Sequence, residues 1–193
     1  SGEWVELTKL HGVENRTLVS IDDIPKHVQD ALISIEDERF ESHHGVDWKS
    51  TAKAILGKLT GTSTRGGSTI TQQVVKNMTG DNEVTIKRKV TEIFRALRLE
   101  KNYSKDEILE TYLNLVYFGN HSYGIQAAAE NYFGKDAKDL TVAEGAAIVG
   151  ITQYPYLYDP SRQGTLDSGK TFREKNKERQ ETVLYKMHEL GYL

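Results

Sequence analysis

Residues 66–77 read GGSTITQQVVKN, and this stretch predicts a helix with a well-defined start. Thr69 followed by Gln72 is a capping-box pattern, in which each side chain binds a free backbone N–H group at the beginning of a helix. Gly66 and Gly67 allow the chain to turn tightly just before that point. The first N–H groups of such a helix can bind phosphate oxygens. The stretch therefore predicts a helix with a candidate anion site at its N-terminus.

Two polar side chains of the same stretch can serve that anion site. Gln73 and Lys76 are three positions apart, so both can line one side of it. The alternative is an ordinary capped helix whose polar residues are solvated, and the capping box by itself favours this reading. The sequence pattern leaves both interpretations open.

The rest of the chain also favours helices. Two further capping boxes precede apolar runs, at Ser104 with Glu107 and at Thr141 with Glu144. Early acidic residues together with Pro25 predict that another helix starts near residue 22. Apolar residues also recur at helical spacing in the ranges 84–101 and 170–190. We find no internal repeat and no alternation of strands with helices, so the expected fold is mainly α.

The composition is that of a single folded domain covering residues 1–193. Hydrophobic residues make up 37% of the chain and charged residues 27%, which excludes a disordered polypeptide. The net charge of −3 gives no bulk attraction to nucleic acid, which is therefore not an expected partner. The absence of cysteine excludes disulfides and thiolate metal sites. No apolar run approaches the roughly 20 residues of a membrane span, so we expect any anchor to lie outside these residues.

Glu36 is the first candidate for catalysis because of its position on a helix. Val28, Leu32, Glu36 and His43 fall near one line of the predicted helix surface. A carboxylate on that inward stripe is partly dehydrated and is suited to act as a general base. The alternative is a surface acid at the edge of the stripe.

Glu92 is the second acidic candidate, on the helix predicted at 84–101. The apolar side chains expected to face the core of the protein are Ile86, Val90, Ile93 and Leu97. Glu92 then projects from the other side, close to Arg88 and Arg95. Taken alone, this pattern favours a solvated face of ion pairs.

Six segments in order resemble the motifs of the peptidoglycan glycosyltransferases, the domain of bifunctional penicillin-binding proteins and of monofunctional enzymes. EDERFESHHG at 36–45 resembles the first motif and GGSTITQQ at 66–73 the second. RKVTE at 88–92 resembles the third and KDEILETYLNLVYFG at 105–119 the fourth. YGIQAAAENYFGK and LTVAEGAAIVG extend the likeness to residue 150. Because the set is ordered and covers most of residues 20–160, the resemblance is specific.

The resemblance implies a lysozyme-like helical fold with a large lobe and a small membrane-facing lobe at roughly residues 45–75. It implies that Glu36 is the catalytic base, that Glu92 is the second essential carboxylate, and that both face one cleft. The substrate-binding residues it implies are Ser68, Thr69, Gln72, Gln73, Lys76, Arg88 and Lys89. Structural and orienting support is implied for Asp37, Phe40 and His43.

The implied partners are lipid II, the growing lipid-linked glycan strand and the outer face of a bacterial cell membrane. By this resemblance, Lys76, Arg88 and Lys89 stabilise the leaving diphosphate. Glu92 either orients these cations or holds a divalent metal, Mg or Mn, that bridges the phosphates. No organic cofactor is expected.

Two further segments are assigned from composition and spacing. Trp48, Ala52, Ile55, Leu56 and Leu59 lie near helical spacing among lysines, which fits either a helix resting in lipid headgroups or a core helix of the small lobe. The glycine- and threonine-rich stretch 57–67 is expected to be a mobile loop bordering the cleft.

Two other functions are compatible with parts of the sequence. A lysozyme-like hydrolase or lytic transglycosylase shares the helical fold and a catalytic glutamate, but it has little use for cations around a diphosphate. A catalytically silent glycan-binding module is the non-enzymatic alternative, and the presence of both glutamates argues against it. Turnover of purified lipid II distinguishes the three.

Overall fold

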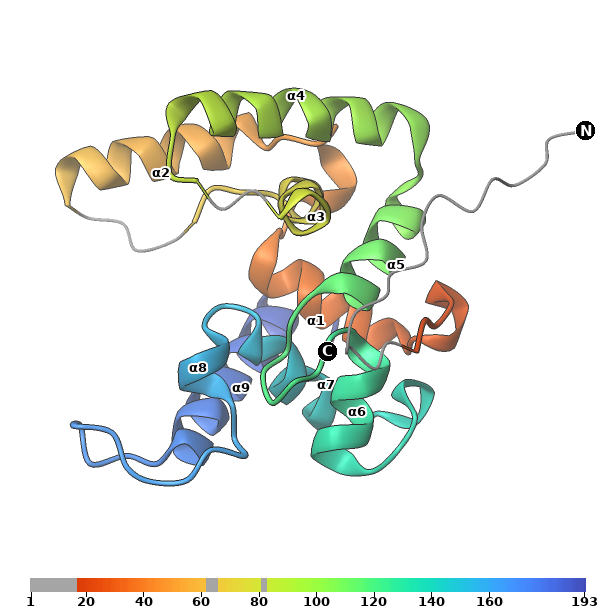
Figure 1. The fold of residues 1–193 in the computed structure, drawn as a ribbon, viewed down its shortest axis with the longest axis vertical. Coiled ribbons are helices and arrows are strands. Elements are labelled where there is room, and N and C mark those ends of the chain that lie inside the picture. The colour runs from red at the N-terminus through yellow and green to blue at the C-terminus, as the bar shows by residue number, and fades with distance from the viewer. Residues whose placement is uncertain (1–16, 62–65, 81–82) are drawn as a thin grey trace, which may run out of the picture.

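A computed structural model describes residues 17–61, 66–80 and 83–193 (Figure 1). Within these ranges the chain forms α-helices and short 3-10 turns, and its only β-type pairings are two isolated bridges. The expected mainly α fold is therefore confirmed.

The first half of the chain carries the helices that border the site described below. They are α1 (Lys26–Glu36), α2 (Trp48–Thr60), α3 (Ile70–Thr79) and α4 (Ile86–Asn102), with 3-10 turns η1 (Ile21–Asp23) and η2 (Phe40–Ser42) around α1. The second half contains α5 (Lys105–Leu115), α6 (Ile125–Phe133), η3 (Ala137–Asp139), α7 (Val142–Ile151), α8 (Pro155–Tyr158) and α9 (Phe172–Glu189).

Local capping chemistry sets several helix starts as expected. The capping boxes that begin at Thr69, Ser104 and Thr141 all form, and a fourth begins at Thr171. The start of α1 differs from the prediction, because residues 21–23 form a separate 3-10 turn and Pro25 is the N-cap of the α-helix.

The main core is built around α7, which packs against α1 and α9. Gly145 permits the close approach of α1, since a Cβ at this position would lie 2.8 Å from Val28 Cγ2. Val28 and Leu32 of α1 are fully buried in this core. The apolar face of α1 is thereby fixed, and the end of the helix at Glu36 is fixed with it.

A smaller apolar cluster lies between α3 and α4 and consists of Val46, Val75 and Ala96. Helix α3 contributes to both cores, because its Val74 packs in the main core while its neighbour Val75 packs in the smaller one. In Figure 1, α2 and α4 lie on one side of α3 and the remaining helices on the other. Helix α3 thus connects the two groups of helices.

The prediction of which apolar side chains of α4 face the core is correct for only half of them. Ile93 and Leu97 pack against the smaller cluster, but Ile86 and Val90 are 86% and 46% exposed. Glu92, expected on a solvated face, is buried instead. The reason is that only the C-terminal half of α4 rests on a core, so the spacing of its first apolar residues does not define the buried face.

Gly45 holds the smaller cluster together from the loop before α2. Its φ is +90°, and a Cβ there would lie 2.6 Å from the carbonyl oxygen of Ala96 in α4. Its own carbonyl accepts a hydrogen bond from the Thr69 hydroxyl at 2.7 Å. A side chain at position 45 would therefore push α4 away from α3.

We expect Gly45→Ala to lower the free energy of unfolding by about 1–3 kcal/mol, measured by urea denaturation. Gly61→Ala is the matched control, since Gly61 also has a positive φ, of +70°, but its Cβ would meet nothing within 4 Å. In both variants an alanine must adopt a positive φ, which costs free energy. The difference between their free energies of unfolding therefore isolates the clash with α4. Equal losses in the two variants would contradict this account of Gly45.

Candidate active site

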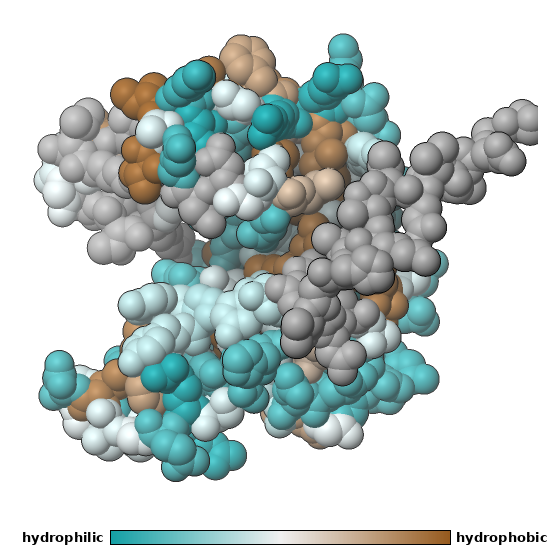
Figure 2. Space-filling model, in the orientation of Figure 1, coloured by the Kyte–Doolittle hydropathy of each residue, from teal (hydrophilic) through white to brown (hydrophobic). Residues whose placement is uncertain are grey.

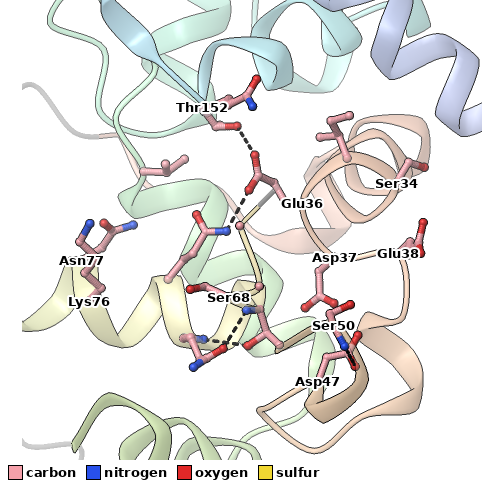
Figure 3. A pocket seen from close by; sticks show the side chains of 18 of the residues that line it. Ser34, Glu36, Asp37, Glu38, Asp47, Ser50, Ser68, Lys76, Asn77 and Thr152 are labelled. Carbon is pink, nitrogen blue, oxygen red and sulfur yellow. Dashed lines mark hydrogen bonds between the residues drawn. The ribbon is translucent and has the colours of Figure 1, made fainter. Parts of the chain in front are cut away.

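A cavity of about 700 Å³ opens where the end of α1, the start of α3, α4 and the segment after α7 meet (Figure 3). Glu36 and Glu92 both line it, so the expectation that the two carboxylates share one cleft is confirmed. Six other predicted site residues also line it: Asp37, Ser68, Thr69, Gln72, Gln73 and Lys76. The cavity therefore brings together segments from the first three predicted motifs.

Glu36 is the last residue of α1, and both of its carboxylate oxygens accept hydrogen bonds. Oε2 accepts from Gln73 Nε2 at 2.9 Å, and Oε1 accepts from the Thr152 hydroxyl at 2.9 Å. The Tyr112 hydroxyl donates to Gln73 Oε1 at 3.2 Å and so orients the amide. These donors hold the carboxylate as an acceptor at the edge of the cavity.

Asp37 occupies the place that the sequence left open for a phosphate. Its Oδ2 accepts hydrogen bonds from the backbone N–H of Ile70 at 3.0 Å and from His43 Nε2 at 2.8 Å. The Thr69 hydroxyl accepts from the N–H of Gln72. The start of α3 is thus satisfied largely by the protein's own side chains, and the carboxylate of Asp37 is the anion at this helix N-terminus.

The side-chain oxygen atoms of Thr69 and Gln72 are also engaged in hydrogen bonds within the protein. The Gln72 side chain accepts from the N–H of Thr69, and the Thr69 hydroxyl donates to Gly45. Both residues are almost fully buried. They line the cavity, but their main contacts build the start of α3 and its junction with the loop at Gly45.

A charge network made of Asp37, His43, Glu100 and Lys105 extends from the cavity wall at Asp37 to the partly exposed Lys105. His43 bonds Asp37 through Nε2, and its Nδ1 lies 3.7 Å from Glu100 Oε1. Lys105 Nζ donates to Glu100 at 2.6 Å and to the His43 carbonyl at 2.7 Å, and it lies 4.4 Å from the Phe40 ring centroid. His43 and Phe40 do not line the cavity, a placement that suits the orienting support implied by the resemblance.

Glu92 lies against two cations. It is 5% exposed and accepts hydrogen bonds from Arg88 at 2.5 Å and from Lys89 Nζ. Lys89 also donates to the Ser68 hydroxyl at 2.8 Å, which connects this group to the cavity wall. Arg88 and Lys89 themselves do not line the cavity. The cluster therefore carries a net positive charge, because two cations surround one carboxylate.

This arrangement does not fit a metal held by Glu92. Both of its oxygens already accept from cations, which repel a divalent ion and compete for the same lone pairs. Among the described residues, no group of three or more His, Asp or Glu side chains is placed to hold a metal. We therefore assign no step to a protein-bound metal.

Asp47 borders the cavity and begins α2. Its carboxylate accepts from the N–H of Ser50 at 3.0 Å and forms a bidentate pair with Arg39. Burial raises the pKa of Asp47, but the hydrogen bonds from Arg39 and Ser50 outweigh this effect and lower it to about 2. The carboxylate is thus charged at neutral pH, and it caps α2 beside the cleft.

The sequence did not point to several residues of the site. Thr152 binds Glu36 directly, Tyr112 orients Gln73, and Tyr117, Gln153 and Arg179 line the cavity. Tyr112 and Tyr117 belong to the stretch 105–119. Their position beside apolar residues was the only sequence feature that could have indicated a role at the site. Thr152 follows the last quoted stretch, and nothing in its local sequence connects it to residue 36.

The helix expected around residues 48–59, for which a headgroup helix and a core helix were both open, exists as α2, and its two large apolar side chains that can be placed are exposed. Trp48 is 60% and Leu56 62% exposed, which argues against a core position for either. The side chains of Ile55 and Leu59 lie outside the description. The loop expected at 57–67 is wrong in its first part, since residues 57–60 continue α2; residues 62–65 lie outside the description, and Gly66 and Gly67 line the cavity. In Figure 2, brown apolar patches interrupt the hydrophilic surface in the region of α2 and α4, which lie at the top of Figure 1. In the described part of the chain, no helix has the length and apolar character needed to cross a bilayer.

Comparison with known proteins gives consistent matches. Residues 3–188 match a family model described as Transglycosylase. The chain is 47% identical to penicillin-binding protein 1F of Bacillus subtilis, over 93% of this chain and 24% of that protein. It is 44% identical to penicillin-binding protein 1A/1B of the same organism, over 94% of this chain and 19% of the relative. The chain thus spans about a quarter or less of these relatives.

A solved structure is also similar. The crystal structure of penicillin-binding protein 1A from Haemophilus influenzae aligns with a TM-score of 0.53 at 23% identity, over 94% of this chain and 16% of that one. At this identity the likeness supports the fold alone.

Proposed function

The chain belongs to the transglycosylase family, the glycosyltransferase domain found in class A penicillin-binding proteins, and from this premise we propose that it polymerises lipid II into peptidoglycan glycan strands. The donor is the growing lipid-linked strand and the acceptor is an incoming lipid II molecule. The observation that carries the proposal is the Glu36 carboxylate, held as an acceptor at the edge of a large cavity.

Glu36 acts as the general base in this proposal. It takes the proton from the 4-hydroxyl of the acceptor sugar while that oxygen attacks the anomeric carbon of the donor. The bond from the anomeric carbon to the diphosphate breaks, and the undecaprenyl diphosphate leaves with the electron pair. A single displacement inverts the configuration and gives a β-1,4 linkage from an α-linked donor.

The cations on the α3–α4 side of the cavity stabilise the leaving diphosphate. Lys76 is exposed and lines the cavity, so it can contact a phosphate directly. Arg88 and Lys89 act from behind Ser68, with Glu92 holding both in place. Glu92 is thus an organiser of positive charge, which explains how an acid can serve a site that binds an anion.

The fold is divided into a large lobe around α7 and a smaller lobe that faces the membrane and includes roughly residues 45–75. Support comes from the separate apolar cluster of Val46, Val75 and Ala96. The exposed Trp48 and Leu56 on α2, and Phe94 on α4 (68% exposed), give this lobe apolar side chains that can enter lipid headgroups. We place the domain at the outer face of a bacterial cell membrane, where its lipid-linked substrate resides.

Incubation of the purified chain with lipid II in detergent or vesicles tests the proposal. We expect glycan polymer to accumulate together with released undecaprenyl diphosphate. Cleavage of existing glycan without polymer would indicate a hydrolase or lytic transglycosylase. Binding without turnover would indicate a silent glycan-binding module, and either result would overturn the assignment.

A further inference from the structure

The Thr152 hydroxyl lies between two acceptors at the mouth of the site. Its Oγ1 is 2.9 Å from Glu36 Oε1 (Figure 3). It is also 2.8 Å from the carbonyl oxygen of Val149. A threonine hydroxyl has one proton and two lone pairs, so it can donate to only one of these acceptors at a time. It can also accept a hydrogen bond from the side that it does not donate to.

The other oxygen of Glu36 faces a donor that cannot reverse. Gln73 presents its amide nitrogen to Oε2, while its own oxygen accepts from the Tyr112 hydroxyl. Burial raises the pKa of Tyr112 well above 10, and the charge of Glu36 raises it further, although the Thr152 hydroxyl acts in the opposite direction. Tyr112 therefore remains protonated and able to donate to Gln73 Oε1, which favours the amide orientation that presents Nε2 to Glu36.

Resting on the proposed function, we infer that Thr152 is a positioning residue for the Glu36 base and reverses its hydrogen bond when Glu36 takes up the substrate proton. While Glu36 is an anion, Thr152 donates to Oε1. When Oε1 has received the proton from the acceptor sugar, Thr152 turns its own proton to Val149 and accepts from the new carboxylic acid. The Thr152 proton changes its acceptor but is not transferred.

This role gives Thr152→Val a specific signature in the pH dependence of polymerisation. Valine keeps the shape of threonine but can neither donate to the carboxylate nor accept from the carboxylic acid. The hydrogen bond to the charged form is the stronger of the two, so its loss outweighs the other and disfavours the anion. We expect the acidic limb of the kcat profile to move about one pH unit higher, the difference between losing a hydrogen bond to a charged group and losing one to a neutral group. The rate on that limb should fall about tenfold, while KM for lipid II stays unchanged, because Thr152 does not bind the substrate in this proposal.

Two further variants separate this role from packing. Thr152→Ser retains the hydroxyl and should restore the wild-type profile. Thr111→Val removes a hydroxyl that donates to the Glu107 carbonyl on the exposed face of α5, away from the cavity, and should leave the profile unchanged. Melting temperatures of all three variants check that the fold is intact.

Other titratable groups face the same cavity and must be common to every variant compared. They are Asp37, Glu38, Asp47, Lys76, Glu92, Tyr117 and Arg179, with Tyr112 facing Glu36 through Gln73. None of them is replaced in the Thr152 series. The Thr152 hydroxyl also acts on Tyr112, but the raised pKa keeps Tyr112 neutral over the whole acidic limb, so a displaced acidic limb reports the Thr152–Glu36 contact.

The outcomes distinguish this inference from the proposed function. If the unaltered chain makes no polymer, the proposed function fails. If it polymerises and the Thr152→Val profile coincides with that of the unaltered chain, only the role of Thr152 is refuted. A serine variant that behaves like valine would also refute it, because the hydroxyl would then have no part in the effect.

Discussion

Glu36→Gln should lower the rate of lipid II polymerisation by about 10²–10⁴-fold, the usual cost of losing a general base. Glutamine has the shape of glutamate but cannot accept the proton. The surroundings can accommodate it, since its amide oxygen can accept from Gln73 while its amide nitrogen donates to Thr152. For this reason we expect an unchanged melting temperature.

The matched control is Glu41→Gln, which makes the same change in the same motif at an exposed position outside the cavity. It should polymerise at nearly the normal rate. Near-normal turnover by Glu36→Gln would remove Glu36 from the mechanism, whereas equal losses in the two variants would mean that the motif tolerates no amide.

Lys76→Ala should lower the polymerisation rate by about 10²–10³-fold, comparable to the loss of one donor that stabilises developing charge. Lys76 is exposed and lines the cavity, so its loss affects the leaving diphosphate more than the packing. The melting temperature should therefore stay close to that of the unaltered chain. Single-turnover assays with purified lipid II measure the chemical step.

Lys87→Ala provides the comparison, because Lys87 is an exposed lysine that does not line the cavity. It should retain activity at moderate salt. If both lysine variants lose activity equally, the effect comes from general surface charge. If Lys76→Ala melts much earlier, Lys76 has a structural role instead.

The parts of the fold that depend on neighbouring residues could be predicted from the sequence. The helix starts at Thr69, Ser104 and Thr141 follow from pairs of residues three positions apart, and all three form. The buried face of α4 depends instead on where α3 and Gly45 meet it. Apolar spacing at Ile86 and Val90 carried no information about that contact.

The same distinction applies to the site. Glu36 and Glu92 could be named from their motifs, and the structure places both at one cavity. The hydrogen bond between Glu36 and Thr152 joins residues 116 positions apart, and no local pattern identifies such a partner. The hydrogen bond from the N–H of Ile70 to Asp37 also depends on tertiary structure, and it puts a carboxylate where the sequence offered a candidate anion site.

The charge network of Asp37, His43, Glu100 and Lys105 restricts how this protein can change over evolutionary time. Replacing one member removes a hydrogen bond or ion pair from its neighbours, and this is costly where the side chain left behind is buried, as those of Asp37, His43 and Glu100 are. The effects of substitutions at these positions are therefore non-additive, and the best residue at one depends on the residues at the others. A change to a different combination of residues at these four positions therefore requires coordinated substitutions. We expect the four residues to be retained or replaced together in evolution.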